Sequence, residues 1–352
     1  MAARRILQVS ARAFVSPAAG GGGSSARGGN PVTIFSPSPA TKLLLTPEFR
    51  SRLAQTCTWE SVVVEPCQED PAVPQFSFYM PSGEEVSFCA HAAIGACSFL
   101  ANKASIISSH EKDATQQHSG GEEHVVTFLA AMDRHKKYNA IVRGNEAELF
   151  MDCELYEAEC NPTGSSLSDF LEEIGLNEDD IDNDAVSTFL NSSVARPKTL
   201  IPVKSADRLH SATPPENATK FQQMCESIES TGLYLYDSSS TTNIECRQFP
   251  KSSGYVEDPG TGIAAGALVA SLHRRQMKSN DAASTGESGE SVSTTVLQGT
   301  AMGRPSQIKV KIDEYTTLST KNNPSHSGNV KISYAGSVAF DSVLYLDETE
   351  LS

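Results

Sequence analysis

Glu60 is the residue whose type and surroundings best suit acid–base chemistry. It stands directly after Trp59 and just before an apolar run of valines at 62–64. A carboxyl group among apolar side chains is costly to ionise, so its pKa rises toward neutrality, as a general acid or base requires. A glutamate between a helix and a strand can equally be an ordinary surface residue. The pattern therefore indicates a candidate proton shuttle and leaves a surface role open.

Two segments built of small residues each carry a polar side chain at their start. In EVSFCAHAAIGACSFLA and in GYVEDPGTGIAAGALVASL, a strand and a turn precede a helix of Ala, Gly and Ser. Helix N-termini present unpaired N–H groups and a positive dipole end, which suit a carboxylate ligand. His91, at the start of the first helix, can bind a carboxylate, assist proton transfer or simply cap the helix. Asp258, before the second, can be an N-capping residue at an Asp-Pro turn.

This repeated unit of strand, turn and helix predicts an α+β protein with two similar halves. Helices of small residues have little side-chain bulk, so a curved, barrel-like mixed sheet can wrap closely around each central helix. The N-termini of both helices are then expected to face a shared cleft. We predict an N-terminal domain at 1–140 and a C-terminal domain at 141–352, and the pattern allows the last strand to return to the first domain.

Length, composition and charge agree with a two-domain chain and restrict its partners. The chain has 352 residues, more than one ordinary domain of roughly 150, and 39% of them are hydrophobic. Its net charge of −15 argues against nucleic-acid and anionic-membrane partners, because phosphate binding requires a basic face. No apolar run reaches the roughly 18 residues that a membrane span needs. We therefore expect a soluble, cytoplasmic protein that binds neither nucleic acid nor membrane.

The eight cysteines show neither CxxC pairs nor zinc-ligand spacing. This absence argues against a structural metal site, and a chain with this much core does not need a disulfide framework. We expect reduced thiols, most of them buried, and no bound metal.

The first 47 residues contain no acidic residue and several arginines, which is typical of an organellar transit peptide. The same stretch also has the pattern of a β-hairpin: RILQVSARAFV and NPVTIF are strand-like, and the glycine-rich PAAGGGGSSARGG joins them. We favour the hairpin. Further strands are predicted at EEVSFC, NVKISYAG and VAFDSVLYL, a helix at TPEFRSRLAQTC, and a solvated loop at SNDAASTGESGESVST.

The chain resembles the PhzF-like family of phenazine-biosynthesis isomerases, which have the diaminopimelate-epimerase-like fold. Five segments carry the resemblance, in the family's order and along nearly the whole chain: GGNPVTIF, TWESVVV, PSGEEVSFCAHAAIGACSFL, EDPGTGIAAGAL and LQGTAMGRPSQIKVKI. They are similar to the family patterns GNPxxVx, SETxFV, TPxxEVxLCGHATLAAAxVL, EDPVTGSAxxxL and QGxxxGRPSxIxV. The resemblance supports the two-half α+β fold and the N-terminal strand.

The resemblance implies a homodimeric isomerase that relocates a proton on a small carboxylate-bearing substrate, without metal or cofactor. Founding members of the family isomerise trans-2,3-dihydro-3-hydroxyanthranilate, and the glutamate of SETxFV, here Glu60, shuttles the proton. Asp258 matches an aspartate implied to hydrogen-bond the substrate or to orient the shuttle. His91 matches the histidine of CGHA. Gly262 matches the glycine whose backbone N–H approaches the substrate, and Arg304, in GRPS, is expected only to fix a turn.

Three positions of the expected substrate site depart from the family pattern. Ala90 replaces Gly, which adds a Cβ and makes positive φ costly, whereas Ile263 and Trp59 each replace a Ser and remove a hydroxyl. We therefore expect a more apolar or differently shaped carboxylate than the founding substrate. The alternative is a catalytically weak or inactive member that acts as a small-molecule-binding or protein-interaction module.

Epimerases of the same fold use two cysteines, one from each half. Cys89 occupies the first of these positions, but the segment around Asp258 and Gly262 contains no cysteine. A two-thiol mechanism is therefore disfavoured, and Cys89 is expected to be a small buried residue.

Overall fold

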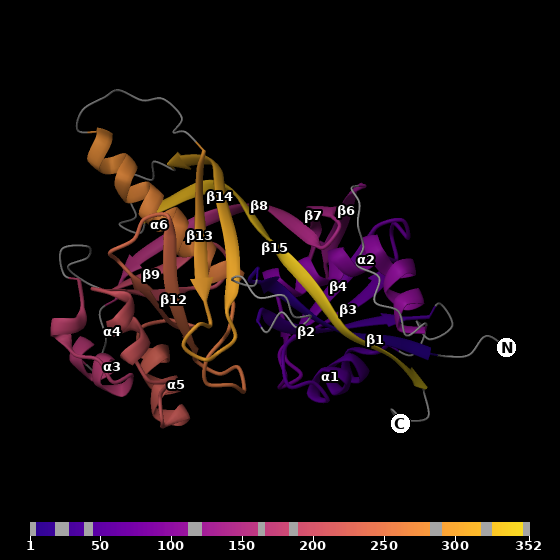
Figure 1. The fold of residues 1–352 in the computed structure, drawn as a ribbon, viewed down its shortest axis with the longest axis horizontal. Coiled ribbons are helices and arrows are strands. Elements are labelled where there is room, and N and C mark those ends of the chain that lie inside the picture. Colours follow the sequence, from indigo (N-terminus) through magenta and orange to yellow (C-terminus); the bar gives the residue numbers. More distant parts are fainter. Residues whose placement is uncertain are drawn as a thin grey trace. The chain divides into compact units, whose positions relative to one another are not determined.

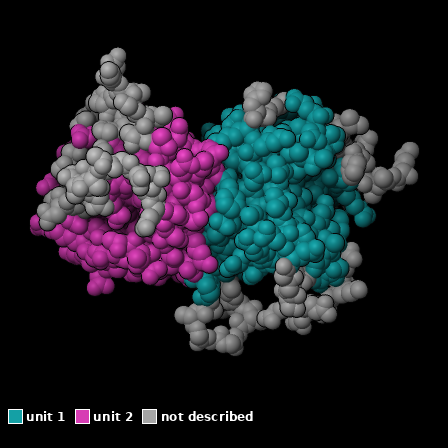
Figure 2. Space-filling view, turned by 90° about the horizontal axis from the view of Figure 1, so that it is seen from above, with its two compact units in different colours: residues 1–150, 335–352 teal, residues 151–334 magenta. Residues whose placement is uncertain are grey.

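The computed structural model describes residues 5–17, 28–38, 45–111, 122–160, 166–182, 189–281, 291–317 and 326–347. Strands dominate the chain, and a few helices lie among them (Figure 1). The chain divides into two compact units, coloured teal and magenta in Figure 2. Unit 1 holds Met1–Phe150 with Ala335–Ser352, and unit 2 holds Met151–Tyr334. The domains predicted at 1–140 and 141–352 stay a prediction.

Unit 1 is a mixed sheet that surrounds one long helix. Its strands are β1 (Arg5–Val15), β2 (Asn30–Pro37), β3 (Ser61–Pro66), β4 (Pro74–Tyr79), β5 (Glu85–Val86), β6 (Glu123–Ala130), β7 (Asp133–Arg143), the first part of β8 (Glu146–Glu159) and the last part of β15 (His326–Asp347). Its helices are α1 (Pro47–Gln55) and α2 (Ala90–Glu111). Strands β1, β2, β3, β6 and β7 all pack against α2, so this helix forms the centre of the unit.

Unit 2 repeats the plan with α6 (Gly262–Asp281) at its centre. The remaining parts of β8 and β15 join β9 (Leu190–Ser193), β10 (Lys198–Val203), β11 (Gly232–Asp237), β12 (Asn243–Pro250), β13 (Val292–Gln298) and β14 (Ser306–Thr317). Strands β9, β10, β13 and β14 contact α6. The shorter helices α3 (Leu167–Glu173), α4 (Ala206–Ser211) and α5 (Ala218–Ser227), with a 3₁₀ turn at Glu178–Asp180, add a second apolar core cluster on strands β10 and β11.

The predicted N-terminal hairpin is confirmed. Strands β1 and β2 pair antiparallel from Ile6↔Pro37 to Ala13↔Asn30, and β1 also pairs with β15. Residues 18–27 of the glycine-rich connector lie outside the described residues, as do residues 282–290 of the predicted solvated loop. The predicted helix after Thr46 is confirmed as well: the Thr46 hydroxyl accepts from the Phe49 N–H at 3.2 Å, and Pro47 occupies the first turn.

Two strand predictions were wrong in extent. The segment EEVSFC forms only the two-residue strand β5, because it pairs with the end of β4 and the chain then turns into α2. The segments NVKISYAG and VAFDSVLYL are a single strand, β15. This strand continues past Gly336 because its second part pairs along β1, from Ser337 to Asp347, with bulges that absorb the irregularity.

The first halves of the two central helices are buried on every side because strands surround them. Alanine is the most frequent residue at their fully buried positions: Ala92, Ala93 and Ala96 in α2, and Ala264, Ala265, Ala267 and Ala270 in α6. A helix without a polar face belongs in an interior, and small side chains let strands approach its backbone closely. The composition of these helices is therefore explained by their position.

Adding one methyl group to α6 is expected to destabilise the protein. In Gly266→Ala, the new Cβ would meet the Tyr334 hydroxyl, with Tyr334 Cε1 at 2.7 Å and Ile332 Cδ1 at 2.8 Å. Alanine gains about 0.5–1 kcal/mol in helix propensity, but overpacking costs about 1–3 kcal/mol. Because Tyr334 is fully buried, we expect the free energy of unfolding in urea to fall by about 1–2 kcal/mol.

A rescue variant provides the control for Gly266→Ala. The Tyr334 hydroxyl has no hydrogen-bond partner among the described residues, so Tyr334→Phe alone should be neutral or stabilising. Combined with Gly266→Ala, it removes the atom that the new Cβ meets and should restore part of the stability. A stabilising effect of Gly266→Ala alone would show that the helix and its sheet are not in close contact here.

Candidate active site

Glu60 lies at the start of β3, inside unit 1. Its backbone oxygen accepts a hydrogen bond from the Thr33 N–H of β2 at 3.1 Å, which places it in the ladder between two parallel strands. Its side chain is only 5% exposed, so the alternative of a surface glutamate is wrong. The neighbouring Trp59 is half-buried. The apolar run in β3 thus brings a carboxyl group into the interior, as the local pattern indicated.

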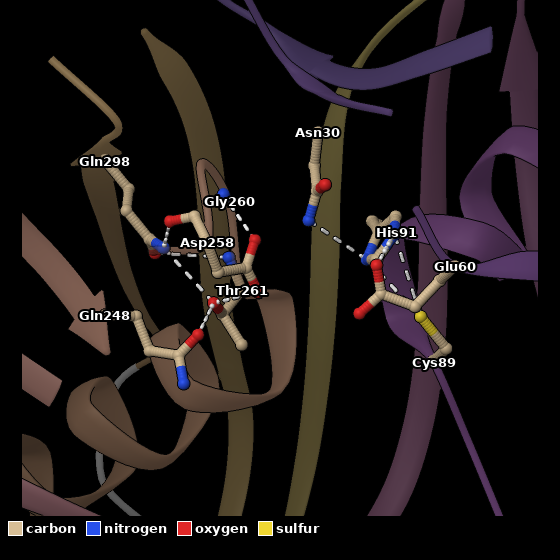
Figure 3. A network of polar contacts seen from close by, with 9 residues as sticks. All are labelled: Asn30, Glu60, Cys89, His91, Gln248, Asp258, Gly260, Thr261 and Gln298. Atoms are coloured by element: carbon tan, nitrogen blue, oxygen red, sulfur yellow. Dashed lines mark hydrogen bonds and ion pairs between the residues drawn. The ribbon is translucent and has the colours of Figure 1, made fainter. Parts of the chain in front are cut away.

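A buried imidazole lies beside this carboxyl group. His91 Nε2 is 3.8 Å from Glu60 Oε2, and its Nδ1 lies 3.3 Å from the Asn30 side-chain nitrogen and 3.3 Å from Cys89 Sγ. In Figure 3 the four side chains converge on one another. The Asn30 amide nitrogen is a donor, so His91 Nδ1 acts as the acceptor and the proton of the neutral ring is on Nε2. That proton faces Glu60.

The fold explains why these four residues meet. Asn30 begins β2 and Glu60 precedes β3, and parallel neighbours have their starts at the same edge of a sheet. Phe88 fixes the chain just before Cys89, because its ring packs 5.4 Å from that of Phe78 and 4.7 Å from that of Tyr138. Helix α2 then starts at this edge. Asn30 was not among the predicted site residues, although it belongs to the motif GGNPVTIF.

Asp258 lies in unit 2, in the turn between β12 and α6. Its Oδ1 accepts from the Gly260 N–H at 3.0 Å and its Oδ2 from the Thr261 hydroxyl at 2.7 Å. Its own N–H donates to the Gln248 carbonyl on β12 at 3.0 Å. The side chain is buried. Asp258 therefore stabilises the turn, as the Asp-Pro sequence indicated. Each of its carboxylate oxygens has two lone pairs, so it can accept a further hydrogen bond.

Two glutamines hold this turn from the neighbouring strands (Figure 3). Gln298 Nε2 donates to the Asp258 carbonyl at 2.6 Å, and its Oε1 accepts from the Thr261 N–H at 3.1 Å and from the Tyr234 hydroxyl at 3.1 Å. The Thr261 hydroxyl donates its single proton to Asp258, so its oxygen can only accept further hydrogen bonds. It accepts from the side-chain amide nitrogens of Gln298, at 3.1 Å, and Gln248, at 3.0 Å. Gln298 was missed although it lies in the motif LQGTAMGRPSQ.

Removing the Gln298 amide is expected to loosen the Asp258 turn. Gln298→Leu keeps the volume but leaves the buried Asp258 carbonyl and the buried Tyr234 hydroxyl without this partner, each costing about 1–3 kcal/mol. We expect the free energy of unfolding in urea to fall by about 2–4 kcal/mol. Gln222→Leu on the exposed surface of α5 is the matched control and should change it by less than about 0.5 kcal/mol. Equal effects of the two variants would contradict an anchoring role for Gln298.

The remaining predicted residues lie at the starts of the two central helices. Ala90 begins α2, and Gly262 and Ile263 begin α6, all of them buried. Ala90 is not among the described residues with positive φ, so the strain expected from replacing a glycine is absent. The Arg304 N–H donates to the Gly299 carbonyl at 2.9 Å, which closes a turn, while the role of the arginine side chain in fixing it stays a prediction.

The eight cysteines are all without disulfides, and six of them are buried. Burial raises the pKa of the Cys160 thiol to about 11 and that of Cys225 to about 12, which keeps both protonated. Within the described ranges, no group of three or more His, Cys, Asp or Glu side chains could hold a metal ion. None of the helices in the described part of the chain combines the length and the apolar character of a membrane span.

Comparison with known proteins places the fold. A family model described as phenazine biosynthesis-like protein matches residues 24–333. A PhzF-family structure from Bacillus anthracis is 18% identical, with a TM-score of 0.66, and the alignment covers 97% of this chain and 99% of that one. A predicted epimerase from Pseudomonas aeruginosa is 21% identical, with a TM-score of 0.62, and the alignment covers 97% of this chain and 99% of that one.

A more distant match is an epimerase whose structure contains a bound amino acid. A hydroxyproline epimerase from Agrobacterium vitis, solved with trans-4-hydroxy-L-proline, is 11% identical, with a TM-score of 0.59 and coverage of 98% and 93%. No curated protein sequence matches the chain. At these identities the solved structures show the fold alone, and they confirm the predicted diaminopimelate-epimerase-like α+β fold.

Proposed function

Because this chain belongs to the phenazine biosynthesis-like protein family of PhzC and PhzF, we propose that it is an isomerase that relocates a proton on a small carboxylate-bearing metabolite. Glu60 is the general acid and base, and the reaction requires neither metal nor cofactor. The observation that carries the proposal is the buried carboxyl group of Glu60, 3.8 Å from the His91 imidazole at the start of a helix.

In this proposal the proton leaves and returns through one group. The Glu60 carboxylate takes a proton from one carbon of the substrate, and the electron pair left behind delocalises through the adjoining unsaturated system. The carboxylic acid then returns the proton to another carbon, so no atoms or electrons are gained or lost. Burial supports this role, because a carboxyl group away from water has a higher affinity for a proton.

His91 acts as the positioning partner of Glu60 in the proposed reaction. Its Nδ1 is held by Asn30 at 3.3 Å, so the ring presents its proton at Nε2 toward the carboxylate. A distance of 3.8 Å is longer than a hydrogen bond, but contacts of this kind tighten when a substrate binds. The N–H groups of the first turn of α2 add a positive dipole end that favours the substrate's carboxylate.

The other predicted residues are proposed to bind the substrate. Asp258 hydrogen-bonds a polar group of the substrate, and the backbone N–H of Gly262 approaches it. Ala90, Ile263 and Trp59, which carry more apolar surface than the family's usual Gly and Ser, favour a more apolar carboxylate than the founding substrate. We also propose, from the family resemblance, a homodimer in the cytoplasm without nucleic-acid or membrane partners.

The proposed isomerase activity is tested by the exchange of substrate protons with solvent, which can be followed in a mixture of candidate substrates. Purified protein is incubated with a small-metabolite extract in deuterated water, and carboxylates are followed by chromatography and mass spectrometry. We expect at least one carboxylate to gain a deuterium or to convert into an isomer, and heat-denatured protein to have no effect. A metabolite that is retained by the protein but neither exchanges nor isomerises would favour the binding module instead.

A further inference from the structure

Unit 2 contains a cavity that the proposed isomerase site does not use. It has a volume of about 220 Å³ and lies where the second half of α6 faces strands β11, β12 and β13. The first α6 residue in its lining is Val269, which lies about 10 Å along the helix from Gly262 at a rise of about 1.5 Å per residue. The Asp258 turn is therefore not part of this cavity. The volume is below the roughly 300–1,000 Å³ of pockets for drug-sized ligands. Only a small molecule fits.

One side of this cavity is apolar. Ile244 of β12 and Val269 of α6 are almost fully buried, and Leu272 and Val292 complete the apolar surface. Apolar side chains around a few convergent polar groups are the usual lining of a small-molecule site. The ligand that suits this part has a compact hydrocarbon body.

A buried imidazole also lines the cavity. His273 is only 7% exposed and is part of the lining. Burial lowers its pKa from the ordinary value, so the ring is neutral near pH 7 and offers one donor and one acceptor. A ligand in the cavity can therefore form a hydrogen bond with a nitrogen of this ring.

The charge of the lining favours an anion. Among the described residues of the lining, Arg275 is the one positively charged group, and none of these residues is Asp or Glu, in a chain whose net charge is −15. Burial raises the pKa of the Tyr236 phenol, and the nearby Arg275 guanidinium partly offsets this rise. Asp182 also influences Tyr236 but does not line the cavity. The hydroxyl groups of Ser240 and Thr241 add donors, whereas the Ser238 hydroxyl donates to the Val203 carbonyl at 3.0 Å.

We propose that this cavity binds a small monocarboxylate with a compact apolar body. The carboxylate contacts Arg275 and the nearby hydroxyl groups, and the His273 imidazole provides a further hydrogen bond. The hydrocarbon part packs on Ile244 and Val269. The site is separate from the proposed proton-shuttle residues, so it holds whether or not Glu60 is catalytic.

Methyl NMR with benzoate as the probe tests the proposal directly. In protein with isotope-labelled valine and leucine methyl groups, benzoate should shift the signals of Val269, Leu272 and Val292 with a Kd on the order of 1 mM. Benzamide, which has the same shape without the charge, should bind at least about tenfold more weakly because it forms no charge-assisted hydrogen bond. Equal binding of the two compounds, or no shift at these methyl groups up to about 10 mM benzoate, would overturn the proposal.

Variants separate this cavity from any other site that takes carboxylates. Arg275→Gln should weaken the benzoate-induced shifts by about tenfold or more, and His273→Phe, which keeps an aromatic ring of similar size, should weaken them as well. Arg52→Gln on the exposed side of α1 is the matched control and should leave them unchanged. Unchanged binding in both Arg275→Gln and His273→Phe would contradict the assignment, and the folded state of each variant is verified by the dispersion of its methyl signals.

Discussion

Replacing Glu60 by glutamine is expected to lower the rate of proton relocation by about 10²–10⁴-fold. Glutamine keeps the shape of the side chain and its place beside His91, but it cannot accept or return a proton. The rate is measured as deuterium incorporation, or isomer formation, in the substrate found by exchange profiling. Because an amide carries no charge, the buried site should tolerate it, and the folded state should be unaffected.

Glu65 provides the matched control for this variant. It lies on β3, the strand that Glu60 directly precedes, and is equally buried, but its carboxylate forms an ion pair with Arg50 at 2.8 Å. Glu65→Gln weakens that pair and should lower the stability while the rate is retained. If exchange survives Glu60→Gln, or if both variants lose it equally, Glu60 is not the proton shuttle.

Replacing Arg247 by alanine is expected to have the largest effect on stability. Its guanidinium binds Glu257 with two hydrogen bonds, at 2.9 and 2.7 Å, and both side chains are about 95% buried. The remaining nitrogen donates to the carbonyls of Leu209 and His210, at 3.2 and 3.3 Å, and to that of Ala212. Its loss leaves a buried carboxylate without a partner, so the free energy of unfolding should fall by about 3–5 kcal/mol in urea titrations.

Two further variants show whether this cost comes from the buried charge. Arg247→Met with Glu257→Leu removes both charges and should be clearly more stable than Arg247→Ala, because apolar replacement of a buried pair is often neutral. Arg143→Ala breaks the exposed pair with Glu123 and should cost less than about 1 kcal/mol. If Arg247→Ala costs no more than Arg143→Ala, the buried pair does not hold the turn that follows Glu257.

Local sequence patterns were sufficient to predict the features that depend on residues within one element. The apolar strand after Glu60 predicts that its carboxyl group enters the interior, and the structure buries it. The alanine-rich segments around His91 and Asp258 predict central helices, because only small side chains allow strands to pack on all sides. The strand-like pattern at the N-terminus predicts the pairing of β1 with β2. Each of these inferences depends on composition within one element and its neighbours.

The extent of strands was not predictable in this way. Strand β15 runs through Gly336 because β1 pairs along it. Strand β5 begins opposite Tyr79, the last residue of β4, and it ends after Val86 although β4 continues, because the chain turns into α2. Pairing partners are distant in the chain, so a local break such as a glycine does not show whether a ladder continues. Strand ends are decided by the register of the sheet.

The sequence by itself determined the fold class, the two small-residue helices and the buried acid at position 60. Only the tertiary structure decided which polar groups meet it, because hydrogen bonds join residues that are far apart in the chain. Asn30 reaches His91 across 61 positions, and Gln298 reaches the Asp258 turn across 40. His273 stands in a basic stretch, HRR, typical of a solvated helix end, yet packing buries it against a cavity. Burial and partner depend on the whole packed unit, which local residue preferences do not encode.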